Sequence, residues 1–600
     1  MNTHDDRMMG RLYMRLLPIQ IVLVIIAGVN NIIDSAFAGN LIGAEAMAVV
    51  GLFFPVLNLI NSINVLFSGG AQIMCGKYLG KQMVEKTKSI FTIDMLMVTV
   101  ITAVLITICE VIPESVASLL GAKGAYVPAL ASYIRGFVIG LIPLMLGTQL
   151  TAFLQIEKKE KLTYTAIGGM LCANVFFNWL FISQLGMGLF GLGLATSISN
   201  FVFFFVQMAY YFTGKAIISF SLSSIRRLDL RDILKNGFPP AISQFCILLR
   251  LVIVNYLVRD NVGSDGLAAL SAVMTFGNLY WSVSAGVTSA VTMLASVHTG
   301  EEDREGLKSL MRVFFKRGIL LVTLASLVYM ALSIPLTNIF FHDPSTPVYS
   351  MTCLGFLLFP ISCPFSAILV GYMNYIHCLG TNEGFVRFSS FFDGVIGMVV
   401  FSAILIPVFG MPGTWIAQIG SGVMLCLIIF GFIIYKNGHF PRTFEDMMCF
   451  PPDFGAGEGN RMDMTIHDVE EAMTVSVGVS GFCRDHGSDL KTANRASLSV
   501  EELVNNIIKH GFTDKKKHHI DMSVTYINET YILTIKDDCK AFNPKEAAEL
   551  FDPEDKTHNI GLRLISGIAQ EMKYHNSFGL NILTIVIRDE GLNIAENVAL

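Results

Sequence analysis

Long apolar runs recur along the chain from about Leu17 to Ile434, separated by short polar segments. Most runs reach or exceed about 20 residues, the length that a helix needs to cross a bilayer. Across the whole chain 53% of residues are hydrophobic and 15% are charged, whereas about a quarter are charged in soluble proteins. The runs therefore predict a polytopic α-helical membrane protein of about twelve spans. We place these spans near residues 17–38, 46–70, 89–113, 131–154, 163–183, 188–212, 236–258, 266–296, 315–340, 350–377, 387–408 and 412–435.

Lys and Arg gather in every second loop. They occur before the first predicted span and between spans two and three, four and five, six and seven, and eight and nine. Among the opposite loops, Lys123 and Arg259 are the exceptions. Cytoplasmic loops of membrane proteins are enriched in these residues, so the alternation predicts that both termini face the cytoplasm. The first apolar run is too long for a cleavable signal core and is interpreted as the first span.

Two short motifs recur about 220 residues apart. Gly43-Ala-Glu-Ala-Met-Ala-Val-Val-Gly51 matches Gly263-Ser-Asp-Gly-Leu-Ala-Ala-Leu-Ser271, and the Gly-Met step at Gly186 recurs at Gly410. Six spans in each half return the chain to the same side of the membrane. The repeat predicts two bundles, residues 1–213 and 230–440, that enclose a cavity and alternate its access by rocking.

The first span and its surroundings resemble a known family. The resemblance rests on Pro-Ile-Gln at Pro18, Asn-Asn-Ile-Ile-Asp-Ser-Ala-Phe-Ala-Gly at Asn30, and Gly-Lys-Tyr-Leu-Gly-Lys ending at Lys81. The chain resembles the multidrug and toxic compound extrusion (MATE) family over roughly residues 10–440. This resemblance implies a bacterial-type plasma (inner) membrane antiporter that exchanges H⁺ or Na⁺ for small organic, often cationic, compounds. The wider superfamily includes lipid-linked oligosaccharide flippases, so a flippase remains an alternative.

Ionisable groups at membrane depth are candidate sites because burying them in lipid is costly. Asp34 lies late in the first span, and the resemblance implies that it is the acidic residue used for cation coupling. Asn174 and Asn178 are four residues apart and share one helical face. Some relatives carry Asp at the second position, so Asn178 departs from a two-carboxylate relay. Asp393 is a further candidate, which we expect to pair with Arg250, whereas Arg387 and Arg135 are expected at membrane interfaces.

After about Arg442 the pattern of apolar and polar residues becomes that of a soluble protein. Residues 441–461 form a Pro- and Gly-rich linker, and residues 462–600 read as an α/β two-layer domain. Helical periodicity covers 466–485, 493–511 and 560–573, and strand-like alternation covers 519–526, 531–536 and 581–588. The domain boundaries therefore predict a transporter over 1–440 followed by a separate cytoplasmic domain.

Three motifs in this domain carry chemistry. Glu502 and Asn506 are four apart on one predicted helix, where a carboxylate and an amide can hold water or Mg²⁺. Asp537 follows a strand and can accept a hydrogen bond from an adenine amine. Gly561 and Arg563 open a helix whose free N–H groups can approach phosphate.

In this order the motifs resemble the ATP-binding fold of gyrase, Hsp90 and histidine kinases, and most of all its anti-sigma-factor serine kinase branch. The resemblance implies that Glu502 is the catalytic base, Asn506 the Mg²⁺ ligand and Asp537 the adenine contact, with Gly561 and Arg563 near the phosphates of ATP. It also implies an anti-anti-sigma-like protein as a partner. Cys539 and Asn559 stand where the family has glycine, which leaves ATP binding and phosphate transfer open.

Composition narrows the remaining functions. A net charge of −5 indicates no nucleic-acid partner. The 11 cysteines are scattered without metal-ligand spacing and read as small buried hydrophobes. Our leading interpretation is an ion-driven efflux antiporter regulated by a cytoplasmic ATP-binding domain. The alternatives are the flippase and a membrane receptor whose kinase-like domain signals to a partner.

Overall fold

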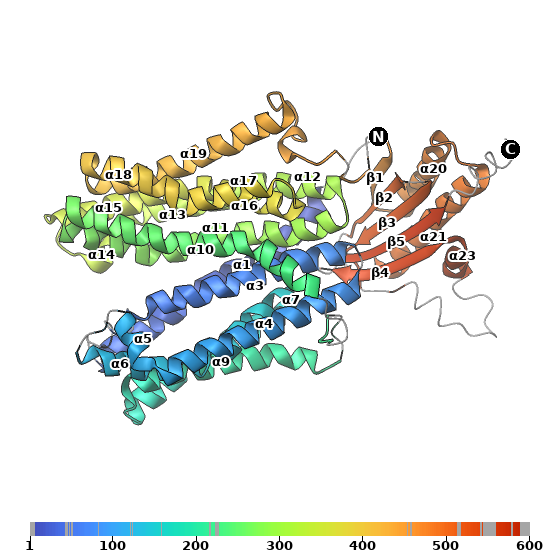
Figure 1. Ribbon diagram of the computed structural model, residues 1–600. Helices are drawn as coiled ribbons and strands as arrows, with labels where there is room; N and C mark the ends of the chain where they lie inside the picture. The colour runs from blue at the N-terminus through green and yellow to red at the C-terminus, as the bar shows by residue number, and fades with distance from the viewer. Residues whose placement is uncertain are drawn as a thin grey trace.

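The computed structural model consists of a long helical part that carries a sheet domain at one end (Figure 1). We call this end of the helical part the domain end and the opposite one the far end. The structure describes residues 6–42, 46, 49, 52–81, 83–120, 122, 124–157, 159–214, 216, 218–221, 227–452, 454–456, 459–512, 518–527, 529–540, 543, 560–577 and 580–588.

Helices of the first half follow the first six predicted spans, in part with shifted ends. They are α1 (Asp6–Phe37) with the π-helical turn η1 (Ala38–Ile42), α3 (Phe54–Gly80), α4 (Val84–Val111), α5 (Pro113–Leu119), α6 (Tyr126–Val138), α7 (Leu141–Ile156), α8 (Glu160–Asn178) with the π-helical η2 (Trp179–Gln184), and α9 (Gly188–Tyr211). The bend of 47° between α6 and α7 falls inside the fourth predicted span.

The second half has a matching order. It comprises α10 (Arg227–Asn261), α11 (Ser264–Gly300), α12 (Arg304–Val313), η4 (Phe314–Gly318), α13 (Ile319–Ala331), α14 (Ser333–Phe340), α15 (Pro347–Leu358), η5 (Phe359–Ile361), α16 (Ser362–Leu379), α17 (Glu383–Phe391), η6 (Phe392–Ile396), α18 (Gly397–Phe409) and α19 (Met411–Asn437). The π-helical turns η2 and η6 lie in the fifth and eleventh predicted spans, which correspond in the two halves.

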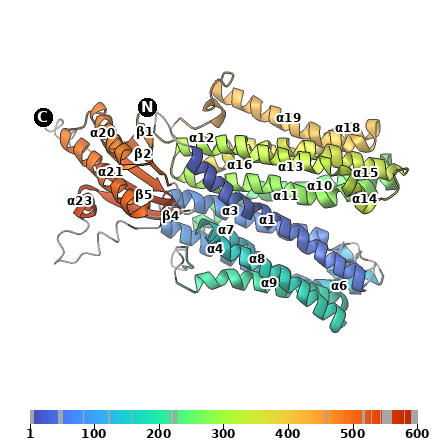
Figure 2. The same cartoon turned by 180° about the vertical axis from the view of Figure 1, so that it is seen from behind.

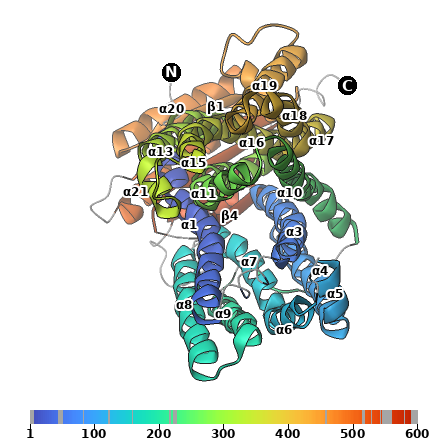
Figure 3. The same cartoon turned by 90° about the vertical axis from the view of Figure 1, so that its left-hand side faces the viewer.

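Eight helical segments among the described residues are long and apolar enough to cross a membrane, and the bent α6–α7 pair makes nine. The other three predicted spans fall on or overlap α1, α3 and α11, and α11 packs against both of the others. These helices lie where the two halves meet, as the view from the far end shows (Figure 3).

The two halves cross closely at the domain end and diverge toward the far end (Figures 1 and 2). A Cβ atom on Gly80 would stand 2.2 Å from the Val297 carbonyl oxygen, and one on Gly300 would stand 2.2 Å from the Lys77 carbonyl oxygen. Gly80 and Gly300 are related by the 220-residue offset of the repeat, so the contact is pseudo-symmetric. Only a residue without a side chain permits this approach of two backbones.

The C-terminal domain contains one antiparallel five-stranded sheet with the order β1-β2-β3-β5-β4. Its elements are β1 (Arg461–Ile466), α20 (Val469–Asp485), α21 (Leu490–Gly511), β2 (Ile520–Ile527), β3 (Thr530–Asp537), α23 (Ile560–Ile568), β4 (Glu571–Ser577) and β5 (Leu580–Arg588). One face of the sheet is covered by α20 and α21, as Figure 2 shows.

Strand alternation gives the sheet two different faces. Tyr531, Leu533 and Ile535 of β3 point into the core under the helices, together with Ile585 of β5. The intervening residues of both strands point toward the domain end of the helical part. Leu580 and Ile582 of β5 belong to the same buried apolar cluster as residues of the helical part.

The structure corrects one prediction for this region and adds two features that the sequence did not indicate. Residues 571–573 belong to β4 instead of extending the helix predicted over 560–573, because they pair with β5. Strand β1 was not predicted, and it begins within the predicted linker. The linker is packed against the helices: Tyr372 and Tyr375 of α16 donate hydrogen bonds to the carbonyls of Met447 and Met448, in the 3₁₀ turn η7 (Asp446–Met448).

The glycine crossing generates a first prediction. Gly300→Ala places a methyl group against the Lys77 backbone, and relieving the overlap should cost about 1–3 kcal/mol. We expect a lower thermal midpoint of the purified protein and weaker packing of the domain end. Gly431→Ala is the matched control, because a Cβ there meets no atom within 4 Å. Equal thermal midpoints for the two variants would contradict the tight crossing.

Candidate transport and nucleotide sites

Asp34 is buried in the first half, 5% exposed, among polar side chains of α8 and α9. Asn174 Nδ2 and Asn178 Nδ2 donate hydrogen bonds to Asp34 Oδ1 at 3.1 and 3.0 Å, and Thr196 Oγ1 donates to Oδ2 at 2.8 Å. Asn178 Nδ2 also donates to Asn174 Oδ1 at 3.1 Å. The face shared by the two asparagines therefore points at Asp34.

Neutral donors surround this carboxylate on both oxygens. Such donors satisfy buried lone pairs without supplying a counter-charge. The cage can therefore hold a carboxylate whose charge is neutralised by an incoming proton or small cation. Thr196 was not singled out from the sequence, because a single threonine in an apolar span gives no signal.

The first half contains a second buried carboxylate, which the sequence analysis did not single out. Asp94 lies in α4, is 0% exposed, and neither of its side-chain oxygens has a hydrogen-bond partner in the described part of the chain. The available signal was an acidic residue inside the third predicted span, which is costly at that depth.

In the second half, Arg250 and Asp393 come together, and their opposite charges attract each other. Arg250 Nη1 donates to the backbone carbonyl of Asp393 at 3.1 Å. This hydrogen bond reaches the main chain of η6, a π-helical turn of a kind that often marks functional positions. Arg387 is exposed and pairs with Glu383 at 3.0 Å, and Arg135 is exposed near the end of α6.

The predicted nucleotide residues lie on the helix-covered side of the sheet. Leu503 and Val504 of α21 are buried in the domain core. Glu502 and Asn506 share another face of the helix and are half-buried. Asn505 Oδ1 is buried without a hydrogen-bond partner among the described residues, so this helix keeps an acceptor available beside Asn506.

Asp537 ends β3 on the same side of the sheet, 4% exposed. Its Oδ1 accepts hydrogen bonds from Asn581 Nδ2 at 2.7 Å and from the Cys539 backbone N–H at 3.0 Å. Burial raises the pKa of Asp537 above its ordinary value, and the bond from Asn581 partly opposes the increase. Asn581 was missed in the sequence, although its strand, β5, was predicted.

Cys539 occupies the space left by a glycine on the neighbouring helix. A Cβ on Gly511 would stand 2.8 Å from Cys539 Sγ, and Cys539 is buried. The side chain that replaces the expected glycine thus packs against the end of α21. Gly561 and Arg563 fall in the first turns of α23, where only the backbone is described, and Asn559 lies outside the described residues.

The chemistry of this side of the sheet fits ATP with Mg²⁺. Asn506, and the Asn505 oxygen that has no partner among the described residues, offer oxygen ligands of the type that Mg²⁺ prefers. Asp537 offers a buried acceptor for an amine. His518, Asp538 and Cys539 form another group with metal-ligand chemistry nearby. Asp538 is already engaged there, because it accepts from His518 at 3.0 Å and pairs with Arg11 at 3.2 Å.

Comparisons with known proteins agree with both parts of the chain. The MatE family model matches residues 18–180 and 239–379, and the model of the histidine kinase-like ATPase domain matches residues 467–587. The probable multidrug resistance protein YoeA of Bacillus subtilis is 23% identical over 52% of this chain and 71% of its own length. The multidrug export protein MepA of Staphylococcus saprophyticus is 20% identical over 58% of this chain and 78% of its own.

Among solved structures, the Vibrio cholerae MATE transporter VcmN in its bent form superposes with a TM-score of 0.66 at 16% identity, covering 74% of this chain and 99% of VcmN. Fold and sequence together define a helical membrane transporter joined to an ATPase-type domain. The chain belongs to the MatE family, and its C-terminal domain is of the histidine kinase-like ATPase type.

The metal assignment generates a second prediction. Asn506→Ala removes the amide that we assign to Mg²⁺. Mg²⁺-dependent ATP binding by the full chain should fall at least about tenfold, because even the loss of a group that only supports a metal ligand typically costs about 10–100-fold in affinity. Calorimetry with and without Mg²⁺ measures this. Asn460→Ala, in the segment before β1, is the control, and equal Mg²⁺ dependence in both variants would refute the assignment.

Burial of Asp537 generates a third prediction. An ionised carboxylate accepts a hydrogen bond from an adenine amine more strongly than a neutral carboxyl group does, and burial raises the pKa of Asp537 above its ordinary value. ATP affinity should therefore decrease as the pH falls through this raised value, at a higher pH than for an ordinary aspartate. Asp537→Asn should bind ATP weakly, and its affinity should not show this decrease at low pH. If the ATP affinity of the wild type stayed constant as the pH was lowered to the range in which an ordinary aspartate titrates, the assignment would be contradicted.

Proposed function

We propose that this protein is an antiporter that exports small organic, often cationic, compounds in exchange for H⁺ or Na⁺, under the control of an ATP-binding domain. The observation that carries the proposal is the buried cage of Asp34, Asn174, Asn178 and Thr196. Its relatives are multidrug resistance and export proteins by name, which supports drug efflux.

The cage accounts for ion coupling in three steps. A proton or cation that enters neutralises the Asp34 carboxylate. The donors from α8 and α9 then have a weaker acceptor, because charge-assisted hydrogen bonds are about twice as strong as neutral ones. The packing of α1 on these helices therefore depends on whether the ion is bound, and this difference can bias the rocking of the two halves.

Charge inside the helical part favours an antiporter of cations over a flippase. Buried carboxylates of the first half, Asp34 and Asp94, give its described interior a negative character. A lipid-linked substrate with phosphate groups would be better served by basic residues. Arg250 of the second half is engaged with a backbone carbonyl of η6.

The location follows from the charge pattern of the loops. Lys and Arg in alternate loops support cytoplasmic termini in a bacterial plasma membrane. The C-terminal domain would then meet cytoplasmic ATP, held by Asp537 at the adenine and by Asn506 through Mg²⁺. ATP would regulate transport while the ion gradient drives it. Glu502, on the face of Asn506, would act as the base if the domain phosphorylates a hydroxyl of an anti-anti-sigma-like partner.

Replacement of the caged carboxylate provides the test. Asp34→Asn preserves the shape but removes the charge, so efflux driven by a proton or sodium gradient should fall to the background of protein-free liposomes. Asp260→Asn, at an exposed position near the end of α10, should transport normally. Gradient-driven efflux of a fluorescent organic cation by Asp34→Asn at the wild-type rate would exclude Asp34 as the coupling group.

A further inference from the structure

Consecutive side chains at the end of β3 lie on opposite faces of the sheet. Because strand residues alternate between faces, Asp537 lies on the nucleotide side of the sheet and its neighbour Lys536 lies on the side that faces the helical part. Lys536 is 8% exposed although it carries a charge. A buried lysine needs partners, and these come from the transporter.

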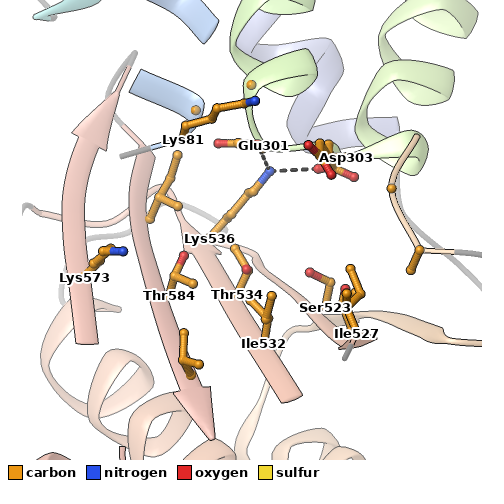
Figure 4. A pocket seen from close by; sticks show the side chains of 18 of the residues that line it. Lys81, Glu301, Asp303, Ser523, Ile527, Ile532, Thr534, Lys536, Lys573 and Thr584 are labelled. Atoms are coloured by element: carbon orange, nitrogen blue, oxygen red, sulfur yellow. Dashed lines mark hydrogen bonds and ion pairs between the residues drawn. The ribbon is translucent and has the colours of Figure 1, made fainter. Parts of the chain in front are cut away.

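Lys536 reaches the turn between α11 and α12. Its Nζ lies 2.6 Å from Glu301 Oε2 and 2.8 Å from Asp303 Oδ2 (Figure 4). Asp303 is also held by Arg461 of β1, whose Nη2 lies 2.7 Å from its Oδ1. His298, at the end of α11, lies 3.3 Å from Glu301 and 3.4 Å from Asp303. We call these five residues the docking cluster.

Charges within the docking cluster stabilise one another. Burial alone would raise the pKa of Glu301, but Lys536 and His298 hold it down to about 2. Burial would likewise raise the pKa of Asp303, but Lys536 and Arg461 hold it well below its usual value. Breaking a buried ion pair on one side leaves an uncompensated charge, which is strongly destabilising. Removal of Lys536 should therefore loosen the contact between the domain and the turn.

The turn that Lys536 holds adjoins the crossing of the two halves. Gly300 immediately precedes Glu301, and the backbone of Gly300 contacts that of Lys77. The sheet faces both sides of the crossing across a cavity of about 430 Å³. Its lining includes Gly80, Lys81 and Met83 of the first half, and Gly300 to Asp303 of the second (Figure 4).

A third contact joins the same strand end to α1. Arg11, near the start of α1, pairs with Asp538 at 3.2 Å. Asp34 lies near the other end of α1. Three consecutive residues, Lys536 to Asp538, therefore connect the turn at the crossing, the predicted adenine contact and the helix that carries the caged carboxylate.

We propose that the C-terminal domain is a nucleotide-responsive clamp on the domain end of the transporter, closed through the docking cluster. This inference rests on the proposed function and assigns the regulation of it. Opening the domain end requires Gly80 and Gly300 to separate. Since both turns face one sheet, their separation removes at least one of them from that sheet. The docked domain therefore favours the closed domain end, and its release favours opening.

Coupling to nucleotide follows from the shared strand end. Any shift of Asp537 on binding adenine is transmitted through the backbone to Lys536 and Asp538, which hold the transporter. Coupling between two sites is reciprocal. If ATP shifts the equilibrium between the docked and the released domain by some factor, then docking must shift ATP affinity by the same factor.

The test uses the full chain in lipid nanodiscs, as wild type, Lys536→Ala and Lys540→Ala. Lys540 is exposed and lies four residues after Lys536, so it is a matched control. Hydrogen–deuterium exchange is followed for peptides covering residues 77–83 and 298–303, with and without Mg²⁺ and ATP. We expect exchange of these turns to become about tenfold faster or more in Lys536→Ala alone. ATP should change the exchange rate in the wild type and in Lys540→Ala but not in Lys536→Ala.

Equal exchange in Lys536→Ala and Lys540→Ala would overturn the clamp, whatever the transport activity of either variant. An ATP effect that persists in Lys536→Ala would overturn its coupling to nucleotide. Efflux by the same three proteins in proteoliposomes keeps the two hypotheses distinguishable. Absence of gradient-driven efflux in the wild type would contradict the proposed antiport, while the exchange data would still decide whether the domain clamps the turns.

Discussion

The backbone contact of α3 and α11 at Gly80 and Gly300 is the constraint on which the rest of the structure depends. It brings the two halves together at the domain end, and they diverge toward the far end. A side chain at either position would hold the helices apart, and the two turns that follow would no longer share one sheet. The position of the C-terminal domain, and the route from its strands to the helices, follow from that contact.

The helical part was largely predictable because the bilayer imposes a simple rule. Backbone groups in lipid must be satisfied within helices, so apolar runs of sufficient length indicate spans. Within the C-terminal domain, alternation located β2, β3 and β5 because each has one face in the core. Strand β1 also alternates, since Met462, Met464 and Ile466 lie on the core side, but it is short and begins within the segment predicted to be a linker. Strand β4 was missed because the helix predicted over 560–573 extended into its first residues.

The candidate sites were predictable only in part. Four-residue spacing correctly placed Asn174 and Asn178 on one face, but their convergence on Asp34 depends on how α8 packs against α1. Asn581 meets Asp537 through pairing of strands that are far apart in the sequence. Local pattern carries no such information. The effect of Cys539 was also context-dependent, because Gly511 provides the space that its side chain needs.

The docking cluster illustrates why an interface between the domain and the transporter would use charge. Apolar contacts, such as those of Leu580 and Ile582, supply attraction but little geometric specificity. Buried ion pairs contribute little net stability, because desolvation offsets most of their attraction, yet each is costly when only one partner remains. Lys536 therefore discriminates between a docked position, in which Glu301 and Asp303 are both satisfied, and any slightly displaced position. Such an all-or-none contact suits a regulatory domain, since a small displacement of one strand end is enough to change its state.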